Sequence, residues 1–162
     1  MSGRVLVAGV GNIFLGDDGF GVEVARRLAG EQLPEDVRVA DFGIRGVHLA
    51  YELLDGYDTA ILVDAAPRGG QPGTVYVIEP EPGAPPDGAP LMDAHGMEPD
   101  AVLGLLEVLG GSSVRVLVVG CEPAEVSERI GLSEPVAGAV DEAIGVVREL
   151  LVQREERKGE RA

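Results

Sequence analysis

The sequence is short of cysteine and aromatic residues, and each shortage excludes a class of protein. Cys121 is the only cysteine among 162 residues, so neither an internal disulfide nor a cysteine-based metal cluster can form. Aromatic residues make up 4% of the chain and tryptophan is absent, so the core must consist of aliphatic side chains. Because 45% of the residues are apolar, the chain can nevertheless build one domain around one core.

Positive charge and long apolar runs are scarce as well. The chain carries 13 lysines and arginines against 28 aspartates and glutamates, a net charge of −15. Such a surface repels phosphate backbones and anionic lipids, so we expect no nucleic-acid or membrane partner. No stretch of about 20 apolar residues could span a membrane, and no signal segment is visible at the start. We therefore expect a cytoplasmic protein.

What the sequence does contain is a regular alternation of apolar runs and helical patterns. We expect strands at 5–10, 37–42, 59–64, 73–78 and 114–119, and helices from 17 or 18 to about 28 and at 47–54, 98–109 and 135–151. This order predicts an α/β three-layer sandwich, in which a five-stranded, mostly parallel, twisted sheet has helices on both faces. The short connection before 73–78 favours an antiparallel edge strand. We assign residues 1–152 to a single domain and expect 153–162 to be a charged, disordered tail.

The most informative segment is GVGNIFLGDDGFG, residues 9–21, which follows the first strand and opens a helical pattern. It resembles the G-x-G-x-x-G fingerprint of dinucleotide sites, but Phe14 stands where the third glycine should be. Asp17 and Asp18 also add negative charge where a pyrophosphate needs hydrogen-bond donors. A glycine-rich turn that carries carboxylates is better suited to hold a cation.

Further acidic residues and a histidine lie at the ends of the other predicted elements. Asp41 ends the second strand, Asp64 ends the third, and His95 precedes the third helix. If the strand order is 2-1-3, these residues and Asp18 lie on the rim where ligands bind in such sheets. Two carboxylates and an imidazole suit a divalent ion such as zinc, nickel or iron. The pattern is thus compatible with a metal site, although no ligand motif on a single element, such as H-E-x-x-H, is present.

Each of these residues also has a purely structural interpretation. Asp17 and Asp18 can cap the first helix, and Asp41 can form a turn. His95 can be an ordinary loop residue. Asp64 is harder to explain in this way, because a carboxylate at the end of a buried strand is costly to desolvate without a partner.

At these positions the chain resembles the hydrogenase maturation endopeptidases. Residues 9–21 match the family's G-x-G-N-x-L-x-x-D-[DE]-G-x-G opening, and DFGIRG at 41–46 resembles its D-x-G-T-x-G segment. LVDA at 62–65 and His95-Gly96 follow in the family's order. The resemblance implies an endopeptidase that removes the C-terminal extension of the nickel–iron hydrogenase large-subunit precursor after metal insertion.

The resemblance also implies roles for individual residues. It gives Asp18, Asp64 and His95 as metal ligands, and the metal is the nickel that the precursor itself carries. We expect Asp41, or else Asp17, to be the catalytic residue that accepts a proton from water. The expected partner is the large-subunit precursor, and the family resemblance suggests a monomer. Cys121 lacks a placed base, so we expect no covalent nucleophile.

The chain departs from the family pattern at Ile44, where the family has threonine, and Arg45 follows it. Arg45 could contact carboxylates of the substrate. These departures concern fine specificity more than the reaction class.

Three alternative functions stay open from the sequence. A receiver-type domain also has an acid pair after its first strand, but it needs a lysine after the fifth, whereas the only lysine here is Lys158. A nucleotide-binding module is disfavoured by Phe14 and by the two acids in the turn. An inactive relative that only chaperones a precursor would have the same sequence pattern.

Overall fold

The computed structural model describes residues 3–79, 99–110 and 114–161. Its strands are β1 Arg4–Val10, β2 Val37–Gly43, β3 Tyr57–Ala65, β4 Val75–Ile78 and β5 Arg115–Cys121. Its helices are α1 Phe20–Ala29, α2 Gly46–Leu53, α3 Pro99–Val108, α4 Glu134–Ala137 and α5 Val140–Arg161, and a 3-10 turn, η1, spans Gly16–Gly19. Each predicted strand and helix is present, with bounds that differ by a few residues, except that the last helix is divided into α4 and α5.

The five strands form one sheet in the order β2-β1-β3-β5-β4. The four strands β2, β1, β3 and β5 are parallel, and β4 runs antiparallel to β5 at the edge. This arrangement confirms the mostly parallel sheet and its antiparallel edge strand. Since β1 has β2 on one side and β3 on the other, the strand order reverses there, and ligands bind at such a point in α/β sheets.

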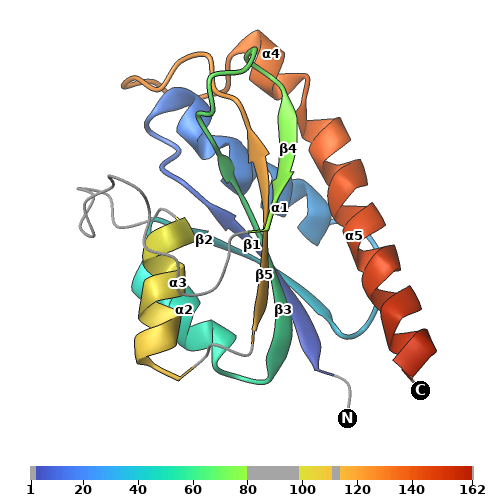
Figure 1. Ribbon diagram of the computed structural model, residues 1–162. Helices are drawn as coiled ribbons and strands as arrows, with labels where there is room; N and C mark the ends of the chain where they lie inside the picture. Colours follow the sequence, from blue (N-terminus) through green and yellow to red (C-terminus); the bar gives the residue numbers. More distant parts are fainter. Residues whose placement is uncertain (1–2, 80–98, 111–113, 162) are drawn as a thin grey trace.

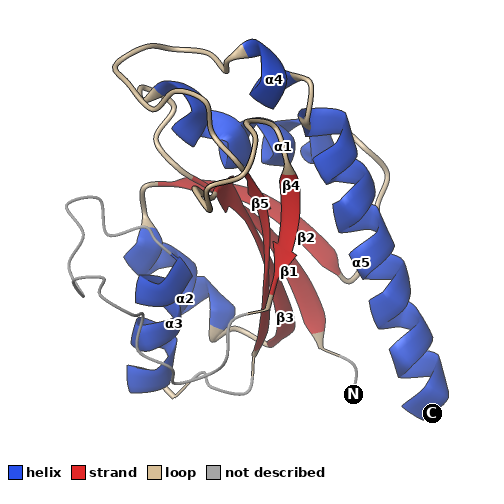
Figure 2. Ribbon diagram, turned by 45° about the horizontal axis from the view of Figure 1, so that its top comes forward, coloured by secondary structure: helices blue, strands red, loops and turns tan. Residues whose placement is uncertain are grey.

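Helices cover both faces of the sheet and complete the three predicted layers (Figure 2). Val5 and Val7 of β1 pack in the core under α1 and α5, whereas Leu6 and Ala8 pack in the core under α2 and α3. This alternation is the period of two that a strand buried on both faces requires. The figures show α1 and α5 on one side of the sheet and α2 and α3 on the other (Figure 1).

The start of α1 differs from the sequence prediction. The helix begins at Phe20 after Gly19, and no side chain caps its first turn. Asp17 and Asp18 lie before it, within η1. The prediction that one of them caps this helix is therefore wrong, because the chain makes a separate 3-10 turn first.

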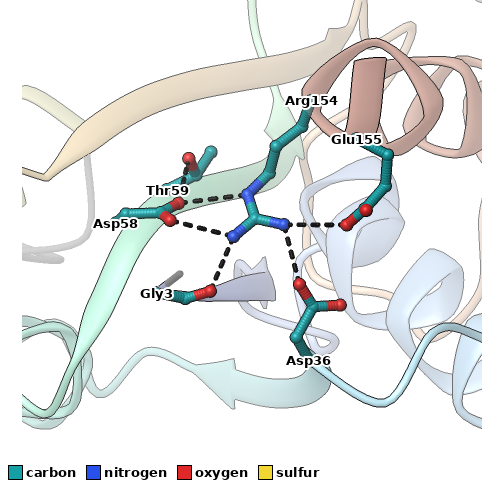
Figure 3. Close-up of polar contacts among 6 residues, drawn as sticks. All are labelled: Gly3, Asp36, Asp58, Thr59, Arg154 and Glu155. Atoms are coloured by element: carbon teal, nitrogen blue, oxygen red, sulfur yellow. Dashed lines mark hydrogen bonds and ion pairs between the residues drawn. The ribbon is translucent and has the colours of Figure 1, made fainter. Parts of the chain in front are cut away.

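The expectation of a disordered tail at 153–162 is also wrong, since α5 continues to Arg161. Arg154 is only 8% exposed, and its guanidinium donates hydrogen bonds to Asp36, Asp58, Glu155 and the carbonyl of Gly3 (Figure 3). These contacts join the last helix to the amino ends of the strands.

Within the described ranges, no helix has both the length and the apolar character needed to cross a membrane.

Candidate active site

The turn after β1 brings the carboxyl ends of two strands together around Gly11. Gly11 has φ 130°, which favours glycine, and its N–H donates to the carbonyl of Gly43 at 2.9 Å. A Cβ on Gly11 would lie 1.9 Å from the carbonyl oxygen of Asp18 and 3.6 Å from Oδ1 of Asp64. Only glycine fits at this position, which both the main chain of Asp18 and the carboxylate of Asp64 approach.

Asn12 orders the turn that carries Asp18. Its backbone N–H donates to Oδ2 of the half-buried Asp18 at 2.7 Å, and its side-chain oxygen accepts from the N–H of Phe14 at 2.9 Å. A short side chain that accepts from the backbone two residues later is the Asx turn, which asparagine favours. The glycine-rich motif contains Asn12, but the sequence pattern alone predicts no role for it.

Asp41 lies at the end of β2, level with Gly9 of β1, and it is exposed. A Cβ on Gly43 would lie 3.8 Å from Oδ1 of Asp41 and 3.9 Å from the carbonyl oxygen of Gly11. The Asp41 carboxylate therefore lies beside the same turn as the other two acids. Asp41 thus lies at the carboxyl end of β2, and its catalytic role stays a prediction.

Arg45 brings a positive charge to the rim. Its Nη2 donates to the carbonyl of Asp41 at 2.8 Å and its Nε to the carbonyl of Phe42 at 3.1 Å. The guanidinium carbon also lies 5.9 Å from the centroid of the Phe42 ring. The side chain is exposed but held in one place, and it uses only part of its five donors in these bonds.

The third expected ligand, His95, lies outside the described residues. Among the residues that are described, no group of three histidine, cysteine, aspartate or glutamate side chains is arranged to hold a metal ion. The ligand set of Asp18, Asp64 and His95 therefore stays a prediction, and the structure shows only that the Asp18 main chain and the Asp64 carboxylate lie near Gly11. Oxygen ligands of this kind are compatible with a divalent ion.

Asp17 lies in a different environment from the one that its neighbour Asp18 occupies. It is fully buried, and its carboxylate accepts from the backbone N–H groups of Ala124, Glu125 and Ser133 and from the Ser133 hydroxyl, all at 2.7–2.8 Å. Burial opposes its ionisation, but these hydrogen bonds outweigh it and lower the pKa of Asp17 below its ordinary value. A carboxylate enclosed in this way stays charged and has no access to solvent.

Glu122 is a second buried carboxylate, for which the sequence predicts no role. It follows β5, is 6% exposed, and its Oε1 accepts from the N–H groups of Arg68 and Gly70 at 2.8 Å and from the Tyr76 hydroxyl at 3.0 Å. The bond from the Arg68 N–H is the main reason that the pKa of Glu122 is lowered. Glu122 thus holds the loop that follows Asp64. An acid directly after an apolar strand was the available signal.

Cys121 is buried beneath this loop, opposite Ala65 of β3. Burial, with smaller contributions from the nearby acids, raises the pKa of its thiol to about 11. A thiol that stays protonated is a poor nucleophile. The structure supports the interpretation of Cys121 as a core residue.

Comparisons with known proteins agree with the resemblance seen in the sequence. The hydrogenase maturation protease family (HycI) matches residues 22–150. The chain is 35% identical over 150 residues to the hydrogenase expression/formation protein HupD of Rhodobacter capsulatus, which covers 91% of this chain and 71% of that protein. A putative hydrogenase maturation protease of Methanocaldococcus jannaschii is 35% identical over 147 residues, covering 88% of this chain and 93% of that one.

Solved structures give the same result. The hydrogenase maturating endopeptidase HybD from E. coli matches with a TM-score of 0.80 at 28% identity and covers 93% of both chains. The hydrogenase 2 maturation peptidase from Thaumarchaeota archaeon SCGC_AB-539-E09 matches with a TM-score of 0.72 at 34% identity, over 91% of this chain and 97% of that one. Sequence and structure therefore point to one group of proteins.

Proposed function

This chain belongs to the hydrogenase maturation protease family, and from that premise we propose that it removes the C-terminal extension of a nickel–iron hydrogenase large-subunit precursor after metal insertion. The observation that supports this proposal most directly is that the Asp18 main chain and the Asp64 carboxylate both approach Gly11, with Asp41 beside the same turn. Acidic residues at the strand-order reversal are suited to a cationic group of the substrate.

In this proposal the nickel is part of the substrate. Asp18, Asp64 and His95 bind the nickel that a filled precursor presents, so a precursor without nickel is recognised poorly. A divalent ion bound by oxygen and nitrogen ligands polarises a neighbouring carbonyl and lowers the pKa of a bound water. The cleavage is therefore metal-dependent, and the metal arrives with the precursor.

Asp41 is the proton acceptor in this proposal. Its carboxylate is exposed at the rim, where a water molecule next to the scissile peptide can reach it. The alternative acceptor, Asp17, is fully buried and accepts four hydrogen bonds from protein groups, so we assign proton transfer to Asp41. Cys121 has a buried thiol with a raised pKa, which agrees with direct attack by water and no covalent intermediate.

The test is a cleavage assay with a nickel-loaded precursor and with the same precursor prepared without metal. We expect cleavage of the loaded form and at least about 10²-fold slower cleavage of the metal-free form, since the metal supplies several kcal/mol of stabilisation. The variant H95A should behave with loaded precursor as the native enzyme does with metal-free precursor. Equal cleavage of the two precursors would remove nickel recognition from the proposal, and binding without any cleavage would indicate a chaperone.

A further inference from the structure

The segment between β5 and α4, residues 122–133, lies at the same end of the sheet as the turn after β1 (Figure 1). Backbone hydrogen bonds join the two. The N–H of Gly16 donates to the carbonyl of Arg129 at 2.8 Å, the N–H of Arg129 donates to the carbonyl of Phe14 at 3.0 Å, and the N–H of Asp17 donates to the carbonyl of Glu125 at 2.9 Å. This β5–α4 segment is thus paired with the stretch of chain that leads into Asp18.

Each end of the β5–α4 segment is bound by a buried carboxylate. Near its start, Glu122 accepts from the loop that follows Asp64. Asp17 accepts from Ala124 and Glu125 near the start and from Ser133 at the end. Asp17 directly precedes Asp18 in η1, and the loop that Glu122 holds begins two residues after Asp64, where the Ala66 N–H donates to the carbonyl of Cys121 at 2.8 Å. The two expected ligands are therefore connected through one segment.

We propose that Asp17 is a positioning residue, which holds the turn of Asp18 at a fixed distance from Asp64 through the β5–α4 segment. Glu122 has the corresponding role at the Asp64 side. This inference rests on the proposed function, because it assumes that Asp18 and Asp64 act together on the substrate. The partners of both carboxylates are loop groups at the rim and Tyr76 of the edge strand β4, whereas the core beneath consists of apolar clusters that do not include them.

The two carboxylates differ in how they accept their bonds, and this difference makes the inference testable. Asp17 uses both oxygens: Oδ1 accepts from the Ser133 N–H, and Oδ2 accepts from Ala124, Glu125 and the Ser133 hydroxyl. In D17N one of the oxygens becomes an amide nitrogen, so at least one backbone N–H loses its acceptor. Glu122 accepts its three bonds with Oε1 alone, so E122Q can keep all of them.

The experiment compares D17N, E122Q and the control E128Q, which changes an exposed carboxylate of the same segment. With nickel-loaded precursor we expect D17N to lower kcat about 10- to 100-fold with KM little changed. Substitution of a residue that orients a metal ligand typically lowers activity by this factor. E122Q should stay within about twofold of the native kcat because its remaining oxygen can accept all three hydrogen bonds, and the control E128Q should do so because it leaves the acceptors Asp17 and Glu122 unchanged.

A second measurement follows the position of Asp18 without any cleavage. The Asn12 N–H donates to the Asp18 carboxylate, so its amide hydrogen exchange reports whether that contact persists. We expect faster exchange at Asn12 in D17N and native exchange in E128Q. If D17N does not fold, S133A, which removes only the hydroxyl donor, should give the same changes in smaller degree.

The outcomes are distinct. A D17N enzyme that is less stable but has native kcat per folded molecule and native exchange at Asn12 would overturn the positioning role and leave the proposed function intact. A native enzyme that does not cleave nickel-loaded precursor would remove the proposed function, whereas the exchange at Asn12 would still decide whether Asp17 holds Asp18 in place.

Discussion

Charged residues at the two ends of the sheet have opposite surroundings. At the amino ends of the strands, one guanidinium, that of Arg154, lies among Asp36, Asp58 and Glu155 and also binds the carbonyl of Gly3 (Figure 3). At the carboxyl ends, by contrast, acids gather around Gly11, and Arg45 donates to main-chain carbonyls there. In the described ranges no arginine or lysine forms an ion pair with Asp18 or Asp41.

This difference separates stability from function. Opposite charges that satisfy one another hold the elements of a fold in place, whereas like charges held close together oppose folding. A site that keeps like charges together retains them for a ligand of opposite charge, and activity of this kind is commonly obtained at a cost in stability. Substitutions at the amino ends should therefore affect unfolding, and substitutions at the carboxyl ends should affect cleavage.

The largest effect is expected for the acids around Gly11. We predict that D18N and D64N each lower kcat/KM for nickel-loaded precursor about 10²- to 10³-fold, because each removes a charged oxygen ligand worth several kcal/mol in the transition state. The measurement is the rate of precursor cleavage. The matched control is D55N, since the Asp55 side chain is 83% exposed and lies at the other end of the sheet, next to Arg4. Native activity in D64N would contradict its role as a ligand.

The next largest effect is expected for stability, at the opposite end. R154M removes the guanidinium that binds Asp36 and Asp58, and removal of one partner from a fully buried pair costs about 3–5 kcal/mol. Since the Asp58 side chain is 43% exposed and retains contact with water, we predict a loss of about 2–3 kcal/mol in the free energy of unfolding, measured by urea denaturation. Activity of the folded protein should be unchanged.

The control for this prediction lies on the same helix. Arg148 pairs with Glu31 at the surface, with 46% of its side chain exposed, so R148M should cost less than about 1 kcal/mol. A similar loss in both variants would mean that Arg154 acts only as a surface residue and that its cluster does not hold α5 in place.

The contrast between the two ends also explains what the sequence could predict. The mostly parallel sheet follows from the alternation of strands and helices, and once the order 2-1-3 is assumed, Asp18, Asp41 and Asp64 fall on one rim, because parallel strands in a sheet end at the same edge. The continuation of α5 could not be predicted in this way, since Arg154 binds Asp36 and Asp58, which lie 118 and 96 residues away in the chain. Its charged surroundings in the sequence are typical of a solvated tail.

The environments of the two acids Asp17 and Asp18 could not be predicted from the sequence either. Asp17 and Asp18 are adjacent and chemically identical, yet one is enclosed by Ala124, Glu125 and Ser133 and the other is half-buried next to Gly11. The partners of Asp17 are mainly backbone N–H groups, which every residue except proline carries, so no residue type in the sequence marks them. Only the course of the β5–α4 segment distinguishes the two acids.

Arg45 offers a smaller effect, on substrate binding. Because carbonyl groups hold its guanidinium at the rim and leave other N–H donors available, we predict that it binds a carboxylate of the precursor. R45Q should raise KM about tenfold, the equivalent of one charge-assisted hydrogen bond, with kcat little changed. R26Q, in an exposed arginine of α1, is the control. The partner can be identified by a charge exchange: R45E should again bind a precursor in which the contacted acid near the cleavage site is replaced by lysine. A native KM in R45Q would contradict this contact.

The smallest effect concerns Cys121, which lies close to the acidic rim but takes part in the core. Burial raises the pKa of its thiol to about 11, so the folded state keeps the proton at a pH where the unfolded chain has lost it. A raised pKa stabilises the fold fully below the unfolded value near 9.0, and this contribution is lost as the pH rises from there to about 11. The difference in unfolding free energy between the native protein and C121A should therefore shrink over that range, as urea denaturation can measure.

Iodoacetamide at pH 8 should label the thiol only in urea, because the thiolate is the reactive form. Rapid labelling of the folded protein with loss of cleavage would instead place Cys121 among the groups that face the substrate.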